Sequence, residues 1–232
     1  MQFQRERSVL RDSAGPQLIK FIEAHNAIVA GGAITSIFSA SKISDFDLFF
    51  LSPGALDSAI ASVPADQKTV DTESALSFSL EGRRVQLIKV LTGTAEQIIA
   101  SFDFTICQGA YIEERGFILA PSFLHHLSQR RLVFNLTADY PICSLYRARK
   151  FIKRGYNFAG IEAIKLGLRI QNLRIATLGE LKKQLMGIDT LFLKDLTDSL
   201  KGKEEKAYDL NEFLSMLEPY MESLDWLTGD SE

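Results

Sequence analysis

The chain has 232 residues, of which 46% are hydrophobic and 24% charged, and its formal net charge at pH 7 is -3. This composition is ordinary for a globular protein, and no apolar run approaches the roughly 18 residues of a membrane-spanning helix. The polar N-terminus lacks the apolar core of a signal peptide, and Cys107 and Cys143 alone are too few for a disulfide framework. We therefore expect a cytoplasmic protein that is not attached to a membrane.

The hydrophobic periodicity predicts strands that interleave with helices up to about residue 135, with helices alone after that point. We expect helices at 15–26, 33–40, 54–62, 94–102 and 121–131, and strands at 27–30, 45–51, 68–72, 76–80, 83–90, 105–112, 117–120 and 132–135. Glu81-Gly82 is a plausible hairpin turn, and the last predicted helix is an amphipathic segment around Trp226 at 213–227. The predicted class is α+β, with a head domain at 1–136 and an all-helical domain at 137–232.

The charge is unevenly distributed along the chain. Residues 126–183 contain 12 Lys and Arg against 3 Asp and Glu, whereas residues 184–232 contain 4 against 12. A basic middle segment favours an anionic partner, namely nucleic acid or a nucleoside triphosphate (NTP). Arg147, Lys150 and Arg154 share one stripe of a predicted helix, which suits phosphate groups; the alternative is a solvated helix face.

The stretch Val29–Phe50, "VAGGAITSIFSASKISDFDLFF", has the residues of a phosphate and metal site. Gly31 and Gly32 turn from a strand into a helix, where backbone N–H groups can meet a triphosphate, and Ser36 adds a hydroxyl. Strand alternation puts Asp45 and Asp47 on one face, and two like charges there favour a bound divalent cation. Mg²⁺, or Mn²⁺ in its place, is the expected metal, and nucleotidyl transfer the expected chemistry.

Three segments resemble motifs of one enzyme family, the class II tRNA nucleotidyltransferases (CCA-adding enzymes) and bacterial poly(A) polymerases. "GGAITS…DFD" is similar to the first motif, "FDFTICQGAY" at 102–111 to the second, and "YPICSLYRARKFIKRGYNF" at 140–158 to a later helix. The resemblance implies a polymerase-β-like head followed by a helical neck. It also implies Asp45 and Asp47 as metal ligands, Gly31 and Gly32 under the triphosphate, and Asp103 in the nucleotide pocket.

The chain departs from the family pattern at several positions. Thr35 and Ser36 replace the Arg and Asp of the first motif, and Gln86 stands where many polymerase-β-like enzymes carry a third carboxylate. The leading hypothesis is a Mg²⁺-dependent transfer of NMP from an NTP to a hydroxyl acceptor, with RNA as that acceptor. The alternatives are transfer to a protein or small molecule, and an inactive NTP- or RNA-binding protein on the same scaffold.

Overall fold

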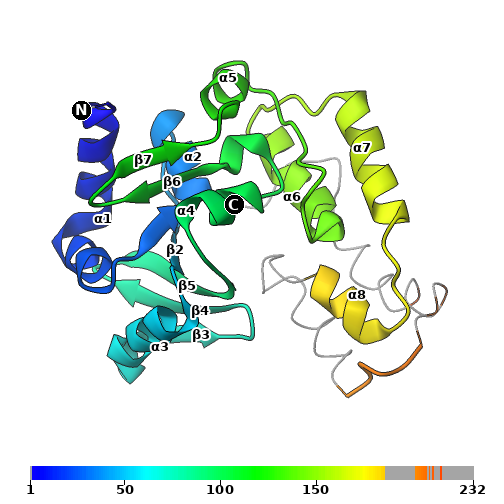
Figure 1. Ribbon diagram of the computed structural model, residues 1–232, viewed down its shortest axis with the longest axis horizontal. Helices are drawn as coiled ribbons and strands as arrows, with labels where there is room; N and C mark the ends of the chain where they lie inside the picture. The colour runs from blue at the N-terminus through cyan, green and yellow to red at the C-terminus, as the bar shows by residue number, and fades with distance from the viewer. Residues whose placement is uncertain (1, 186–201, 208, 210, 212–214, 216–232) are drawn as a thin grey trace. The chain divides into compact units, whose positions relative to one another are not determined.

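A computed structural model describes residues 2–185, 202–207, 209, 211 and 215 of the chain. The chain divides into two compact units, Met1–Ala138 and Asp139–Glu232, which are described separately (Figure 1). The first unit contains the helices α1 (Gln4–His25), α2 (Gly32–Phe38), α3 (Pro53–Ser62), α4 (Ala95–Ala100) and α5 (Phe123–Ser128), and the 3-10 turns Ala65–Gln67 and Thr105–Cys107. Its strands are β1 (Ile28–Ala30), β2 (Phe46–Phe50), β3 (Lys68–Asp71), β4 (Ala75–Leu80), β5 (Arg83–Thr92), β6 (Gly109–Ile112) and β7 (Gly116–Leu119).

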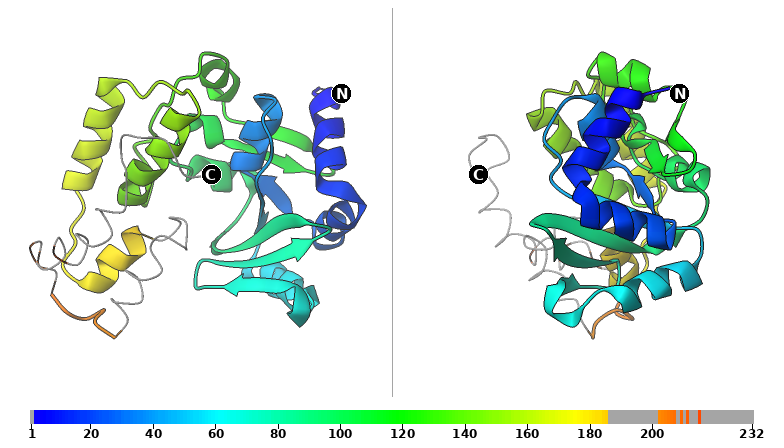
Figure 2. Two further views of the ribbon diagram at one scale, coloured as in Figure 1. Left: turned by 180° about the vertical axis from the view of Figure 1, so that it is seen from behind. Right: turned by 90° about the vertical axis from the view of Figure 1, so that its left-hand side faces the viewer.

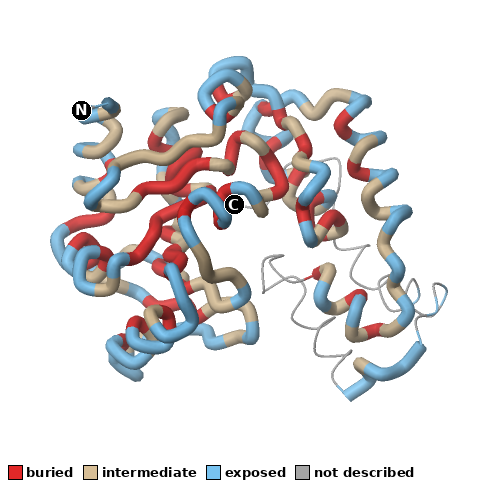
Figure 3. The backbone as a smooth tube through the Cα atoms, viewed as in Figure 1, coloured by how far each residue is buried: buried red, intermediate tan, exposed pale blue. Residues whose placement is uncertain are grey.

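These seven strands form one mixed sheet in the order β3-β4-β5-β2-β1-β6-β7. Strand β2 pairs in parallel with β5, and every other pairing in the sheet is antiparallel. The α+β class predicted from the sequence is confirmed. The central strands β1, β2 and β6 are largely buried, whereas the edge strand β3 is exposed and the other edge strand, β7, is partly buried (Figure 3).

Alternate residues of the central strands face two different layers. Phe46, Leu48 and Phe50 of β2 are buried on one side of the sheet. On that side, the Phe21 ring of α1 lies 5.6 Å from the Phe78 ring of β4. Figure 2 shows α1 beside the sheet. On the other side α4 packs against an apolar cluster that includes Ala30 and Phe49. Asp47 lies between Phe46 and Leu48, so its side chain belongs to the α4 side.

Some predicted elements are confirmed and others are wrong. Glu81 and Gly82 both have positive φ, 50° and 76°, as a two-residue hairpin turn requires. The strand expected at 105–112 begins only at Gly109, because Thr105–Cys107 forms a 3-10 turn. The strand expected at 132–135 is wrong. Its Val133 carbonyl and Asn135 N–H bond to the loop at 103–105, and it makes one isolated bridge, Phe104–Phe134, instead of joining the sheet.

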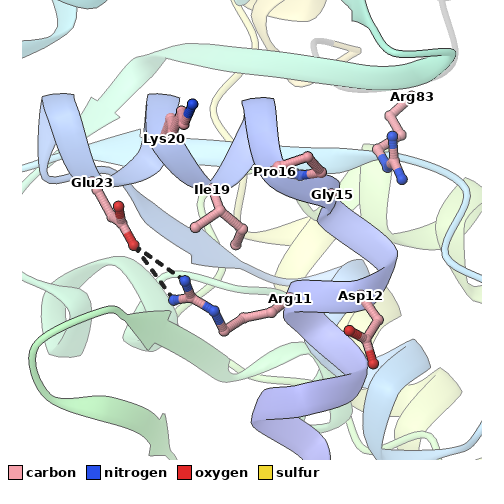
Figure 4. Close-up of a pocket in the computed structure, with 8 residues that line it drawn as sticks. All are labelled: Arg11, Asp12, Gly15, Pro16, Ile19, Lys20, Glu23 and Arg83. Atoms are coloured by element: carbon pink, nitrogen blue, oxygen red, sulfur yellow. Dashed lines mark hydrogen bonds and ion pairs between the residues drawn. The ribbon is translucent and has the colours of Figure 1, made fainter.

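Helix α1 begins at Gln4 and not at residue 15, and it is kinked at Gly15, where φ is 74° and ψ is 167°. The kink accommodates the Arg83 guanidinium, because a Cβ at position 15 would lie 2.7 Å from its Cζ. Arg83 Nε donates to the Ser13 carbonyl at 2.6 Å. A hollow of about 560 Å³ lies beside this kink, and Arg11 and Glu23 form an ion pair at its rim (Figure 4).

The regular elements of the second unit's described part are helices, and Ala207 forms an isolated bridge with Thr177. The unit contains α6 (Pro141–Lys153), α7 (Gly160–Gln171) and α8 (Leu178–Gln184), and α6 contacts both of the others. The predicted helix at 213–227 lies outside the described residues, apart from Ser215. Among the helices that the structure describes, none combines the length and the apolarity needed to cross a bilayer.

Glu113, at the turn between β6 and β7, ties α1 to the sheet. Its carboxylate accepts hydrogen bonds from Arg7, from Arg11 and from the fully buried Tyr111, the last at 2.6 Å. Burial alone would raise the pKa of Glu113. The hydrogen bonds from Tyr111 and Arg7 and the charges of Arg11 and Arg7 outweigh burial, so this pKa lies below its usual value.

Replacement Glu113→Gln should lower the free energy of unfolding at pH 7 by about 1–3 kcal/mol, because the buried Tyr111 hydroxyl and the partly exposed Arg7 and Arg11 lose a charged acceptor. The pKa of Glu113 is lowered in the folded state, so its stabilisation is complete above the ordinary value of 4.5 and is lost as the pH falls. Urea unfolding as a function of pH should therefore show a difference from wild type that shrinks below that pH. The exposed neighbour Glu114→Gln is the matched control, and an equal effect there would contradict the assignment.

Candidate functional site

The end of β1 and the beginning of β2 lie side by side because of the antiparallel register. Ala30 pairs with Asp47, and Gly31 and Gly32 follow Ala30 directly. The glycine turn therefore passes the side chains that precede Asp47 on β2. The sheet register thus places Asp47 beside the residue that precedes the glycine turn, and Asp45 lies two residues before Asp47.

The two glycines have different roles in this turn. Gly31 has φ 75° and ψ -128°, a conformation that essentially only glycine adopts, and its N–H donates to the Gly109 carbonyl at 3.0 Å. A Cβ there would lie 3.6 Å from the Phe102 ring, in ordinary contact. Gly32 begins α2, and a Cβ there would meet no atom within 4 Å. Gly31 therefore shapes the turn, and Gly32 borders open space.

A row of polar side chains crosses three strands on the α4 side of the sheet. Asp47 of β2 is in register with Gln86 of β5, and Gln86 is in register with Ser77 of β4. Residues directly opposite one another in neighbouring strands point to the same face. Asp47 and Gln86 are partly buried, whereas Ser77 is 5% exposed. On the other side of Asp47 the row continues with two small residues, Ala30 and Ala110.

Asp45 lies one position before β2 and accepts a hydrogen bond from the Ser44 hydroxyl at 2.5 Å. On β5 the exposed Arg84 lies two residues before Gln86, and therefore on the same face of the sheet. The other cations of β5 face the opposite side and are engaged there. Arg83 bonds to the Ser13 carbonyl, and Lys89 pairs with Asp71. Arg84 is thus the β5 cation on the face of the carboxylates.

The second motif packs directly against the glycine turn. Besides its contact with Gly31, the Phe102 ring lies 5.6 Å from that of Phe49. The Thr35 hydroxyl, at a position where the resembled family has Arg, donates to the Ile106 carbonyl at 2.7 Å. This bond joins the two motifs through a neutral side chain.

Ser36 and Asp103 are buried, with 6% exposure each. The Ser36 carbonyl accepts the Ser41 N–H at 2.8 Å, and the Asp103 carbonyl accepts the Asn135 N–H at 2.7 Å. Their backbones therefore hold α2 and the loop before β6 in place. Roles of their side chains toward a nucleotide stay predictions.

The basic stripe lies on α6 of the second unit. Lys150 is exposed, Arg154 caps the C-terminus of the helix and is exposed, and Arg147 is partly buried. Lys150 and Arg154 thus present positive charge to solvent.

The side chains at the carboxylate row suit a hard divalent cation. Within the part of the chain that the structure describes, no three His, Cys, Asp or Glu residues cluster closely enough to hold a metal ion. The donors on this face are two carboxylates, an amide and a hydroxyl. Oxygen donors of this kind fit Mg²⁺ or Mn²⁺ and do not fit metals that prefer sulfur or imidazole. The donor set therefore fits the expected cation, with an amide in place of the third acid.

Comparison with known proteins gives a family and a fold. The family model described as "Gabija anti-defense 2 family protein" matches residues 4–130. The "Gabija anti-defense 2" protein of Bacillus phage SPbetaL7 is 34% identical over 221 residues, which are 90% of this chain and 55% of that protein. The chain thus spans about half the length of this relative.

Solved structures of CCA-adding enzymes share the fold at low sequence identity. The Thermotoga maritima enzyme complexed with tRNA is 15% identical with a TM-score of 0.53, covering 93% of this chain and 53% of that one. A CCA-adding enzyme in complex with CTP is 15% identical with a TM-score of 0.56, covering 93% of this chain and 54% of the enzyme. These similarities confirm the nucleotidyltransferase-like fold that the motifs predicted, and they show the fold alone.

The two glycines provide a matched pair of variants. Gly31→Ala should lower the free energy of unfolding by about 1–3 kcal/mol, because alanine is strained at this φ and ψ. Gly32→Ala should change it by less than about 0.5 kcal/mol, since the added methyl group meets open space. Chemical denaturation of both variants measures the difference. Equal destabilisation would contradict the distinction between a shaping glycine and an open one.

Proposed function

This chain belongs to the Gabija anti-defense 2 family. From its nucleotidyltransferase-like fold and the carboxylate beside the glycine turn, we propose that it is a Mg²⁺- or Mn²⁺-dependent nucleotidyltransferase. It would transfer NMP from an NTP to a hydroxyl group of an acceptor. The chain spans only about half the length of its phage relative. The proposal therefore concerns the chemistry of this chain and not that of the whole relative.

The observation that carries the proposal is the register that sets Asp47 beside the glycine turn on a nucleotidyltransferase-like sheet. Asp45 and Asp47 would hold the metal ion, which when bound supplies charge to offset the triphosphate and to activate the attacking hydroxyl. Gly32 leaves room for phosphates to approach the backbone, and Gly31 keeps the turn in shape. Arg84, exposed on the same face, is placed to contact the leaving phosphates.

In the proposed reaction the acceptor oxygen attacks the α-phosphorus in line with the leaving group. The bond from the acceptor oxygen to the α-phosphorus forms, the anhydride bond between the α- and β-phosphates breaks, and pyrophosphate leaves. Ser36 is proposed to stabilise the triphosphate and Asp103 to contact the nucleotide, on the motif resemblance alone.

RNA is the proposed acceptor because Lys150 and Arg154 present positive charge along α6, together with the partly buried Arg147. Among the proteins with this fold, one was solved with tRNA and others with CTP and ATP. The phage relative carries the name of an anti-defense protein, which makes a protein component of the Gabija system a second acceptor to test.

A second candidate function is nucleotide or RNA binding without turnover. The observation that favours it is Gln86, which is in register with Asp47 at the position where a third carboxylate is expected. A neutral amide lowers the negative charge available to a metal ion. The assay below separates this candidate from catalysis.

Incubation with each α-labelled NTP and Mg²⁺ should transfer label to an acceptor, and Asp45→Asn or Asp47→Asn should reduce transfer by about 100-fold or more. Cellular RNA and lysate of cells carrying the Gabija system serve as acceptors, and label is followed on RNA and protein separately. Asp57→Asn, an exposed carboxylate on α3, is the control and should retain activity. Thermal unfolding checks that each variant folds.

The outcomes distinguish the candidates. Label on RNA that depends on both aspartates supports RNA as the acceptor. Label on protein would instead identify a protein component of the Gabija system as the acceptor. NTP binding without label on any acceptor or in small molecules would favour the binding protein. Full activity in both aspartate variants would refute the metal site.

The double replacement Lys150→Gln and Arg154→Gln should weaken RNA binding and lower its salt dependence. Loss of two phosphate contacts reduces the slope of log K against log salt by about 1.4 for single-stranded RNA. Fluorescence anisotropy at several salt concentrations measures this slope. Lys20→Gln with Lys68→Gln, two exposed lysines of the first unit, is the charge-matched control. An unchanged slope in the α6 variant would show that the stripe is a solvated face.

A further inference from the structure

Gln86 lies between two polar residues in the row that crosses β4, β5 and β2. Ser77 is its partner on one side and Asp47 its partner on the other. Neighbouring strands are about 4.8 Å apart, so a glutamine side chain in the middle reaches both partners. Val85 and Leu87, which flank Gln86 on β5, are fully buried on the opposite face, so the register of Gln86 is firmly fixed.

The amide of Gln86 has a defined orientation. Its Nε2 donates to the Ser77 hydroxyl at 3.2 Å, and Ser77 is buried in β4. The amide nitrogen therefore points toward β4, which leaves Oε1 as the amide atom available to the other side of β5, where β2 and Asp47 lie. Among the described residues, no donor bonds to Oε1 of Gln86. An oxygen donor thus faces the carboxylate row.

We propose that Oε1 of Gln86 is a ligand of the divalent metal ion, in the place of the third carboxylate, and that Ser77 is the positioning residue that turns this oxygen toward the ion. The inference rests on the proposed function, because it assigns Asp45 and Asp47 to the same ion. Glutamine carbonyl oxygens are accepted ligands of hard divalent cations. The Ser77 hydroxyl acts as an outer partner, of the kind that orients a ligand without touching the metal.

This arrangement has a consequence for metal affinity. A ligand set of two carboxylates and an amide carries a charge of -2, whereas three carboxylates carry -3. The ion is then held weakly by the protein alone and more firmly when triphosphate oxygens complete its coordination. Metal binding should therefore depend strongly on the bound nucleotide.

The test measures Mn²⁺ binding by electron paramagnetic resonance, with and without a non-hydrolysable NTP analogue. Gln86→Ala and Ser77→Ala should each weaken Mn²⁺ binding by about 10- to 100-fold, and Gln86→Glu should strengthen it. Ser77→Thr, which keeps the hydroxyl, should restore most of the affinity. Ser79→Ala is the matched control, because Ser79 is exposed on the same face of β4 and pairs with Arg84.

A second measurement detects the ligand itself. Luminescence lifetimes of bound Eu³⁺ in H₂O and D₂O give the number of coordinated water molecules. Gln86→Ala should add about one water, because one protein oxygen is lost from the coordination shell. Thermal unfolding of each variant excludes a loss of binding that merely reflects a loss of fold.

Unchanged affinity and water number in both Gln86→Ala and Ser77→Ala, with binding abolished by Asp47→Asn, would overturn the inference and leave the proposed function intact. Mn²⁺ binding that is insensitive to Asp47→Asn would refute the proposed metal site, and the inference with it. Absence of Mn²⁺ binding under both conditions would also overturn both.

Discussion

The position of β2 in the middle of the sheet is the constraint on which the candidate site depends. This strand is paired antiparallel with β1 and parallel with β5, so its register is fixed from both sides. The pairing with β1 brings the glycine turn next to Asp47, and the pairing with β5 brings Gln86 next to Asp47. Because Phe46, Leu48 and Phe50 are buried on the opposite face, a shift by one residue would turn the Asp47 carboxylate into that apolar layer. The apolar packing of β2 thus determines where the polar groups lie.

Much of this arrangement follows from short sequence signals. The alternation in "DFDLFF" predicts which residues of β2 are buried, and Gly31-Gly32 predicts the turn. The two-residue turn at Glu81-Gly82 also determines the partners in β4 and β5, because residues equally distant from such a turn face each other. Ser77 could therefore have been found opposite Gln86 from the sequence, and it was overlooked because serine in a strand carries no chemical signal of its own.

Other features depend on tertiary contacts that no local pattern encodes. Strands β2 and β5 pair in parallel although α3, β3 and β4 lie between them in the chain. Nothing in the sequence of either strand therefore indicates that Asp47 and Gln86 are partners. The first half of α1 is largely polar, and its position is set by Arg7 and Arg11 contacting Glu113 about a hundred residues later. The segment at 132–135 has the composition of a strand, but the loop at 103–105 takes up the hydrogen bonds of Val133 and Asn135.

Helix α1 is joined to strands on either side of the β2-β1 pair in the sheet. Its N-terminal half bonds to Glu113 beside β6 and β7, and its kink holds Arg83 at the start of β5. Helix α1 therefore has no complete set of partners until residue 113 has been synthesised. Contacts between such distant residues require closure of long loops, which slows folding. The N-terminal helix is consequently expected to dock late, after the hairpins that it connects have formed.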